Sequence, residues 1–326
     1  MRIRHFVTLF FFTLSISVAG ESCFDFFPGS FKVVQGHPAY AVEKNRFVSL
    51  ACPIGKKIVA YDRLKGLCLF EDHTSRPFYL TKSRPPLYFC PADKKEDVKI
   101  LSYPVAIYPG KLSKRYGIEG ALFGSCCKLA GIVGREGEWY DTKAIRQLMR
   151  GDIRHGDIGV RFSLHGANII IESVDPYANV PLLPGDRVES LNGKKSPDFR
   201  SVLQMVDRCK NEETLLLGIS RQGRSLTAHL NCFERLGGGK VSDTFLERFG
   251  IHFDNALRII EIDPDKKAYE RGLRKGDRLL MIDGKMVGSE HEIRDLLSGY
   301  AMKKRLPGTM LWDRAGFQFF LPLGSI

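Results

Sequence analysis

The segment Gly124-Ser125-Cys126-Cys127 is where side chains that can act as nucleophiles lie closest together in this sequence. A serine hydroxyl or a cysteine thiol becomes a strong nucleophile when a histidine within hydrogen-bond reach takes its proton. His37 and His73 are the histidines that could serve Cys126 in this way. A thiol or serine protease built on this segment is therefore one hypothesis, and it competes with a structural role for the same cysteines.

The cysteines have a simpler interpretation as disulfide partners, which persist in an oxidising compartment. The candidates are Cys23, Cys52, Cys68, Cys90, Cys126, Cys127, Cys209 and Cys232. Cys209 ends a predicted helix and Cys232 ends a predicted strand of the same domain, so this pair is expected to bond. Too many pairings are open to the other six cysteines for one to be chosen. Metal-ligand spacings such as Cys-x-x-Cys or His-x-x-x-His do not occur, so neither a metal site nor a cofactor is predicted.

The first residues indicate the compartment. Arg2 and Arg4 precede an apolar run over residues 6–18, and Ala19 is a small residue suited to cleavage. This order predicts a secretory signal peptide over residues 1–19. The apolar run is too short for a spanning helix, which needs about 20 residues. The mature chain is therefore expected to be periplasmic, without a transmembrane segment, and its formal charge falls from +12 to +10 when both arginines are removed.

Composition and charge exclude several classes of protein. The chain of 326 residues is 44% hydrophobic and 26% charged, which are ordinary globular values, so wholesale disorder, collagen and a polytopic membrane protein are excluded. The basic residues are spread through the chain without a nucleic-acid motif, and export removes the protein from nucleic acids. Acidic protein surfaces, cell-wall polymers and anionic headgroups remain open as partners of the positive charge.

Short β-rich runs separated by turns fill the N-terminal half, as is typical of a barrel or sandwich. The predicted strands are residues 31–34, 39–42, 47–51, 57–61, 67–70, 78–80, 98–107, 122–123 and 128–133. A helix follows over residues 142–149, with Asp141 as its N-cap.

A repeat organises the C-terminal half. The segment 182–194, Leu-Leu-Pro-Gly-Asp-Arg-Val-Glu-Ser-Leu-Asn-Gly-Lys, recurs over residues 273–285, and Gly185 and Gly276 are 91 positions apart. Ile158-Gly159-Val160 and Phe249-Gly250-Ile251 keep the same offset of 91. Each unit continues with an amphipathic helix, which begins near Phe199 in the first and near Ile293 in the second, and closes with two strands. Two domains of the same fold are predicted.

This repeat resembles the bacterial variant of the PDZ domain, on the segment Leu-x-x-Gly-Asp-x-hydrophobic-x-x-hydrophobic-(Asn/Asp)-Gly. The resemblance implies that Ile158, Gly159, Val160, Phe249, Gly250 and Ile251 form the two carboxylate-binding loops. In such a domain the loop N–H groups capture a terminal carboxylate and the peptide adds a strand beside the helix. The glycine lets the backbone approach the ligand. A groove that holds an internal segment instead is the alternative.

The mature chain as a whole resembles the HtrA/DegP family, in which a trypsin-fold protease precedes one or two PDZ domains. Four segments carry the resemblance: residues 36–49, 57–70, 119–132 and 154–160. The implied fold class is mainly β, with a degenerate, shortened trypsin-like double β-barrel followed by two α+β PDZ domains. The implied bounds are 20–152 for the protease-like domain, 153–235 for the first PDZ domain and 240–326 for the second.

The same resemblance places the catalytic triad on residues that cannot perform its chemistry. The histidine position falls on Cys52, the aspartate position on Gly66 and the nucleophile position on Ile118. A serine protease needs a nucleophile, a base and a carboxylate that orients the base. The sequence thus predicts a catalytically inactive pseudoprotease. Cys68 lies two residues past Gly66 on the same strand face, so a Cys52–Cys68 disulfide is expected to lock the former centre.

The function that this resemblance implies is a non-enzymatic periplasmic scaffold or adaptor whose partners are other proteins, bound as peptides or C-terminal segments in the PDZ grooves. An inactive member with this layout is a scaffold of the bacterial flagellar motor, so flagellar components and motility are the finer expectation. The rival functions are a protease that uses Ser125 or Cys126, and a holdase chaperone. Phe24, Phe26 and Phe27 suggest contacts in a homo-oligomer, with burial in the core as the alternative.

Overall fold

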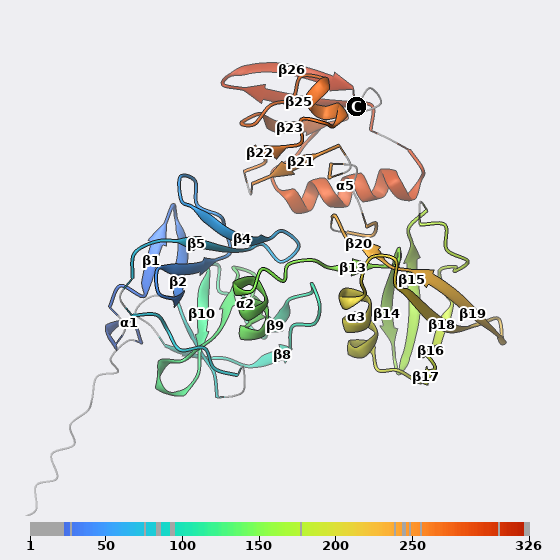
Figure 1. The fold of residues 1–326 in the computed structure, drawn as a ribbon, viewed down its shortest axis with the longest axis horizontal. Helices are drawn as coiled ribbons and strands as arrows, with labels where there is room; N and C mark the ends of the chain where they lie inside the picture. Colours follow the sequence, from blue (N-terminus) through green and yellow to red (C-terminus); the bar gives the residue numbers. More distant parts are fainter. Residues whose placement is uncertain are drawn as a thin grey trace, which may run out of the picture.

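The computed structural model describes residues 23–26, 28–74, 76–82, 86–91, 95–176, 178–237, 239–242, 246–247, 249–254, 256–305 and 307–322. The predicted signal peptide, residues 1–19, lies outside them. Figure 1 shows three parts: a blue-to-green N-terminal domain, a green-to-yellow domain beside it, and an orange-to-red domain that lies across both. Strands predominate, and the mainly β fold is confirmed. None of the described helices is long and apolar enough to cross a membrane.

Two antiparallel sheets form the N-terminal domain, where the resemblance implied two barrels. The first runs β1-β2-β3-β5-β4 and the second β7-β6-β10-β11-β12-β9-β8. The strands of the first sheet are β1 (Phe31–Val34), β2 (His37–Glu43), β3 (Arg46–Ser49), β4 (Ile58–Asp62) and β5 (Leu67–Glu71). The strands of the second are β6 (Tyr88–Cys90), β7 (Glu96–Asp97), β8 (Ile100–Ser102), β9 (Gly110–Leu112), β10 (Gly120–Phe123), β11 (Leu129–Val133) and β12 (Glu138–Asp141).

Two predicted strands of this domain are wrong or shortened. The strand expected over residues 98–107 is only β8, which ends at Ser102, because Pro104 has no N–H to donate to a ladder. The chain then forms a turn in which Val105 and Tyr108 exchange two backbone hydrogen bonds of 3.0 and 2.9 Å. The strand expected over residues 78–80 is reduced to a single bridge between Leu80 and Leu129.

Aromatic side chains fill the core between the two sheets. Tyr40, Phe78 and Phe123 are buried there. The ring of Phe24, on the short helix α1 (Cys23–Phe26), stacks on Phe31 with centroids 4.4 Å apart and lies 5.7 Å from the ring of Phe123. Phe24 is therefore part of this core. Residue Phe27 and the side chain of Phe26 lie outside the described part of the chain, so the predicted oligomer contacts are not tested there.

The helix α2 (Thr142–Met149) closes the N-terminal domain, and its predicted cap is confirmed. The carboxylate of Asp141 accepts hydrogen bonds from the backbone N–H groups of Lys143 and Ala144, both at 3.1 Å. Such a cap satisfies donors that the first turn leaves without an intrahelical partner. The helix buries Ile145 and Leu148 against the sheets.

The first repeat folds around the sheet β14-β15-β16-β18-β19, with β17 paired to β16 and the helix α3 packed against it. A small ladder of β13 and β20 joins its two ends. Its elements are β13 (Gly156–Asp157), β14 (Val160–His165), β15 (Asn168–Val174), β16 (Arg187–Leu191), β17 (Lys194–Lys195), α3 (Phe199–Arg208), β18 (Thr214–Arg221), β19 (Arg224–Asn231) and β20 (Phe233–Glu234).

The second repeat has the same plan, with the ladders split into β21-β22 and β24-β23-β25-β26. Its elements are β21 (Ile251–Phe253), β22 (Ile259–Ile262), α4 (Lys267–Glu270), β23 (Arg278–Ile282), β24 (Lys285–Met286), α5 (Glu290–Met302), β25 (Thr309–Arg314) and β26 (Phe317–Pro322). Trp312 is fully buried in its core.

The repeated Gly-Asp dipeptide has the same physical role in both units. Asp186 is buried, accepts a hydrogen bond from the N–H of Leu183, and forms an ion pair with Arg221 at 2.7 Å. Asp277 is equally buried and pairs with Arg314 at 2.6 Å. In each unit a carboxylate at the turn thus holds the end of the hairpin that closes the domain.

Candidate peptide-binding loops and triad positions

The residues at the three triad positions lie on loops at the ends of strands. Cys52 follows β3 and is bonded to Cys68 on β5, with Cα atoms 5.2 Å apart. Gly66 occupies the turn directly before β5, and Ile118 precedes β10 with 52% of its surface exposed. Neither glycine nor isoleucine carries a group that can attack a carbonyl or exchange a proton. The cysteine pairing expected for this region is present.

The residue beside Ile118 has a partner that sequence reasoning missed. The ring Nδ1 of His37 lies 3.0 Å from the carboxylate of Glu119. The side chain of Glu119 is only 11% exposed. The guanidinium of Arg135 lies 3.6 Å from the same carboxylate. His37 and Glu119 are 82 residues apart, so no local sequence signal could have revealed the contact. The negative charge at Glu119 is thus held by two basic side chains.

The cysteine-rich segment is divided between a disulfide and a free thiol. Cys127 is bonded to Cys23, which fastens α1 to the 3₁₀ turn η1 (Ser125–Cys127). Cys126 is exposed and Cys90 is buried, and neither forms a disulfide with another described cysteine. Burial raises the pKa of the Cys90 thiol to about 11. Cys90 and Cys126 were disulfide candidates, and the structure corrects this because neither has a described sulfur within bonding reach.

The pair Cys209–Cys232 is bonded in the first PDZ-like domain, as the sequence suggested. Cys209 caps the C-terminus of α3 and Cys232 follows β19. The bond therefore ties the end of the helix to the last long strand of the sheet.

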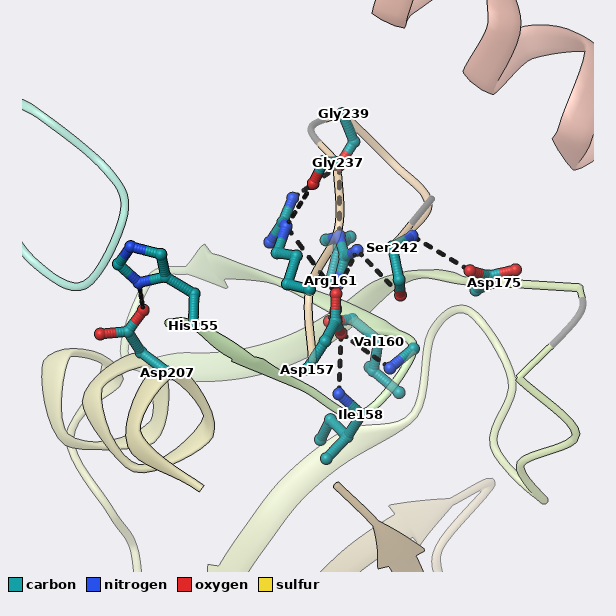
Figure 2. Close-up of polar contacts among 12 residues, drawn as sticks. His155, Asp157, Ile158, Val160, Arg161, Asp175, Asp207, Gly237, Gly239 and Ser242 are labelled. Atoms are coloured by element: carbon teal, nitrogen blue, oxygen red, sulfur yellow. Dashed lines mark hydrogen bonds and ion pairs between the residues drawn. The ribbon is translucent and has the colours of Figure 1, made fainter. Parts of the chain in front are cut away.

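The loop Ile158-Gly159-Val160 has its amides occupied by a neighbouring side chain (Figure 2). The Oδ1 atom of Asp157 accepts hydrogen bonds from the N–H groups of Ile158 and Gly159, at 2.7 and 2.8 Å. These are the amides expected to receive the carboxylate of a bound peptide. Asp157 is 1% exposed, so an internal carboxylate is held where a ligand carboxylate was expected.

Arg161 completes this arrangement from β14. Its guanidinium makes a bidentate contact with Asp157, with both N–O distances 2.8 Å. Although burial opposes ionisation, the charge and hydrogen bonds of Arg161 lower the pKa of Asp157. The Nε atom of Arg161 also donates to the carbonyl of Gly239 at 3.2 Å, in the segment that leads to the second PDZ-like domain. The sequence analysis assigned no role to Asp157.

The glycine of this loop is required by packing rather than by a ligand. Gly159 has a φ of 72°, and a Cβ built on it would collide with Ala178. Its presence therefore does not by itself indicate peptide binding.

The loop Phe249-Gly250-Ile251 of the second repeat also has its amides satisfied. The N–H groups of Phe249 and Ile251 donate to the carbonyl of Leu246, and that of Gly250 donates to the carbonyl of Glu247. The distances lie between 2.8 and 3.1 Å. A carboxylate could be received here only if this backbone turn opened.

A buried group of charges joins the N-terminal domain to the first PDZ-like domain. The ring of His155 lies 3.0 Å from Asp62 through Nε2 and 2.7 Å from Asp207 through Nδ1. Lys65 also reaches Asp62, at 2.8 Å. Burial disfavours the imidazolium, but the hydrogen bonds to Asp207 and Asp62 outweigh this and raise the pKa of His155. Burial favours the neutral form of Asp62, yet its hydrogen bond to His155 and the charge of Lys65 lower its pKa.

Comparison with known proteins identifies the two repeats. Residues 156–232 and residues 258–303 each match a model of the PDZ domain. Among solved structures, the HtrA-type protease AlgW with a tripeptide is similar with a TM-score of 0.47 and 14% identity, over 64% of this chain and 93% of that chain. AlgW with a decapeptide gives a TM-score of 0.45 and 15% identity, over 62% and 83% of the two chains.

Two curated proteins described as DegP-like are similar to this chain over part of its length. A probable periplasmic serine endoprotease, DegP-like, from Bartonella henselae is 24% identical over 216 residues, which cover 56% of this chain and 43% of the relative. A protein of the same description from Halomonas elongata is 24% identical over 165 residues, 45% of this chain and 34% of the relative. The chain spans less than half the length of these relatives. The two repeats are therefore PDZ domains, and the chain is similar over part of its length to DegP-like proteins.

Proposed function

We propose that this protein is a non-enzymatic, periplasmic scaffold of the HtrA-like type. The observation that carries the proposal is the Cys52–Cys68 disulfide, which consumes the side chain at the histidine position. A sulfur in a disulfide neither accepts a proton as a base nor acts as a thiolate. Gly66 and Ile118 likewise offer nothing that could replace the carboxylate and the nucleophile.

The surroundings of the nucleophile position support the same conclusion. Acyl transfer requires donors that stabilise an oxyanion, and a carboxylate in that place opposes it. Glu119 stands beside Ile118 with its carboxylate in contact with His37. His37, one of the two histidines that could serve a relocated catalyst on Cys126, is engaged in this pair instead.

The partners of such a scaffold are other proteins, since PDZ domains generally bind peptides or protein segments. The names of the DegP-like relatives support a periplasmic location. At the finest level we propose that the partners belong to the flagellar motor. A deletion strain that swims normally, or in-cell crosslinking that recovers no motor component, would overturn that part and leave the scaffold proposal standing.

The absence of catalysis can be tested by peptide hydrolysis. Purified full-length protein is incubated with fluorescent casein, beside an active DegP-like relative as positive control. We expect turnover no higher than that of the Ser125→Ala and Cys126→Ala variants. Robust turnover that either substitution abolishes would overturn the proposal and establish a relocated catalyst. Suppression of casein aggregation at substoichiometric amounts, without a specific crosslinked partner, would replace the scaffold with a holdase.

A further inference from the structure

The groove of the first PDZ domain lies between β14 and α3, where a peptide would add as a strand. Phe162 contributes to it from β14, and Phe199 and Leu203 from α3. These apolar side chains line a channel together with the polar residues Arg161, Glu172 and Ser173, and Arg161 in turn contacts Asp157. What fills this channel decides whether the domain can accept a partner.

A segment of the N-terminal domain enters the channel. The loop Pro104–Tyr108, between β8 and β9, packs Val105 and Ala106 against the core of the first PDZ domain. Figure 1 shows this loop leaving the sheet edge at β8 and β9 toward the domain that contains α3. Val105 and Phe162 line one shared cavity of about 310 Å³, so the loop and the groove face each other directly.

Polar contacts anchor the loop at both ends. The guanidinium of Arg200, in the first turn of α3, donates two hydrogen bonds to the carbonyl of Pro104, at 3.2 and 2.7 Å. Tyr108 hydrogen-bonds with the side chain of Arg235 at the other end. The turn itself is held by the paired backbone bonds of Val105 and Tyr108, so the loop arrives with its shape already fixed.

The carboxylate end of the groove is closed as well. A peptide terminus would have to displace Asp157 from two amides and from Arg161. A peptide carboxylate that took this place would leave the carboxylate of Asp157, which is 1% exposed, buried without its partners. Displacement is therefore much less favourable than entry into an empty loop.

We propose that the first PDZ domain takes Pro104–Tyr108 as its own ligand, with Asp157 standing in for a terminal carboxylate. The domain then clamps the protease-like domain and does not receive peptide termini from partners. A tethered segment competes at an effective concentration in the millimolar range, so a free peptide of ordinary affinity does not displace it. The inference holds whether or not the protein is catalytic.

The test uses a peptide copy of the loop as the binding probe. A fluorescein-labelled peptide with the sequence of residues 100–112 includes β8 and β9, which can pair and hold the turn. In full-length protein Val105→Asp places a charge against the apolar side chains of the channel and expels the tethered loop. We expect this variant to bind the labelled peptide at least about tenfold more tightly than wild type, in which the tethered loop competes. Hydrogen exchange in β14 and α3 should also accelerate.

A matched control is Leu101→Asp, the same kind of change at a side chain that is 62% exposed on β8. It should bind the probe as weakly as wild type. Arg200→Ala, which removes the two bonds to Pro104 without placing a charge in the core, should give intermediate binding and serves if Val105→Asp does not fold. A probe that itself carries Val105→Asp should not bind.

Two outcomes would overturn the proposal. One is a folded Val105→Asp or Arg200→Ala variant that binds the probe no better than wild type. The other is a probe that binds only with a free C-terminal carboxylate and not when amidated, because that would show a carboxylate site open to ligands. Equal binding of the acid and amide forms supports the proposal.

Discussion

At the scale of single residues, two carboxylates, those of Asp157 and Glu119, are bound by other groups of the same protein. Asp157 is bound by two amides and Arg161, and Glu119 by His37 and Arg135. Each carboxylate stands where the HtrA resemblance led us to expect a ligand or an oxyanion. Because Arg161 pairs with Asp157 and the guanidinium of Arg135 lies 3.6 Å from Glu119, neither place offers a vacant site for a second anion.

The Cys52–Cys68 disulfide should stabilise the N-terminal domain substantially. A bond that closes a loop of this separation, 16 residues, is worth about 3 kcal/mol in the chain-entropy description. We expect Cys52→Ser/Cys68→Ser to lower the free energy of unfolding by roughly this amount in urea titrations. Cys126→Ser, at an exposed and unpaired thiol, should change it by less than about 0.5 kcal/mol. Equal losses in the two variants would show that the bond is not the source of the stability.

At the scale of elements, the buried charges around His155 join β4 and its turn to α3. Protonated His155 and Lys65 balance Asp62 and Asp207, so the group is neutral only while the imidazole is charged. The raised pKa of His155 means that its contribution to stability is complete below its ordinary value of 6.5 and is lost as pH rises through the folded-state pKa. The lowered pKa of Asp62 acts at the other end, since its contribution is present above 3.8 and is lost as pH falls through its folded-state pKa.

The pH dependence of unfolding tests this arrangement. Wild type should lose stability as pH rises above about 6.5, by about 1.4 kcal/mol for each unit by which the pKa of His155 is raised. His155→Gln should be less stable at pH 6 and nearly flat over the same range, as followed by circular dichroism. His165→Gln, at an exposed histidine on β14, should behave like wild type. The same decline in His155→Gln would assign the effect to other groups.

At the scale of the whole molecule, the connection between the two PDZ domains is built on close backbone approach. Arg161 and Arg235 of the first domain donate to the carbonyl of Gly239, at 3.2 and 3.1 Å. Gly239 has a φ of 82°, and a Cβ there would lie 2.5 Å from the hydroxyl of Ser298 on α5. A side chain at this position would therefore both strain the backbone and push α5 away.

Gly239→Val should loosen the second PDZ domain from the first. We expect tryptic cleavage after Arg235 or Lys240 to accelerate about tenfold, which corresponds to about 1.4 kcal/mol of easier local opening. The radius of gyration from X-ray scattering should rise as well. Gly299→Ala is the control, because a Cβ at this helical position meets nothing within 4 Å. Unchanged cleavage and scattering in Gly239→Val would mean that this contact does not hold the domains together.

The repeat and the start of α2 could be predicted from the sequence because they depend on patterns of neighbouring residues. The 91-residue offset predicted two similar domains, and Asp141 predicted the start of α2. The disulfide Cys209–Cys232 followed from the ends of predicted elements in one domain, whereas Cys52–Cys68 was expected from the triad positions that the HtrA resemblance implied. The strand expected over residues 98–107 failed because β-propensity there was overridden by Pro104 and by packing against another domain.

The sequence by itself predicted a mainly β chain with a repeated C-terminal unit, since turn residues, alternation and spacing are read from neighbours along the chain, and the likeness to PDZ domains and HtrA proteins came from a resemblance of segments. Only the tertiary structure decided what occupies the binding positions. His37 meets Glu119 across 82 residues, and Arg200 meets Pro104 across 96. Such contacts depend on how whole domains pack, and no pattern of neighbouring residues encodes them. That these two loops bind a carboxylate stays a prediction, while the hydrogen bonds of their amides to Asp157 and to backbone carbonyls came from the fold.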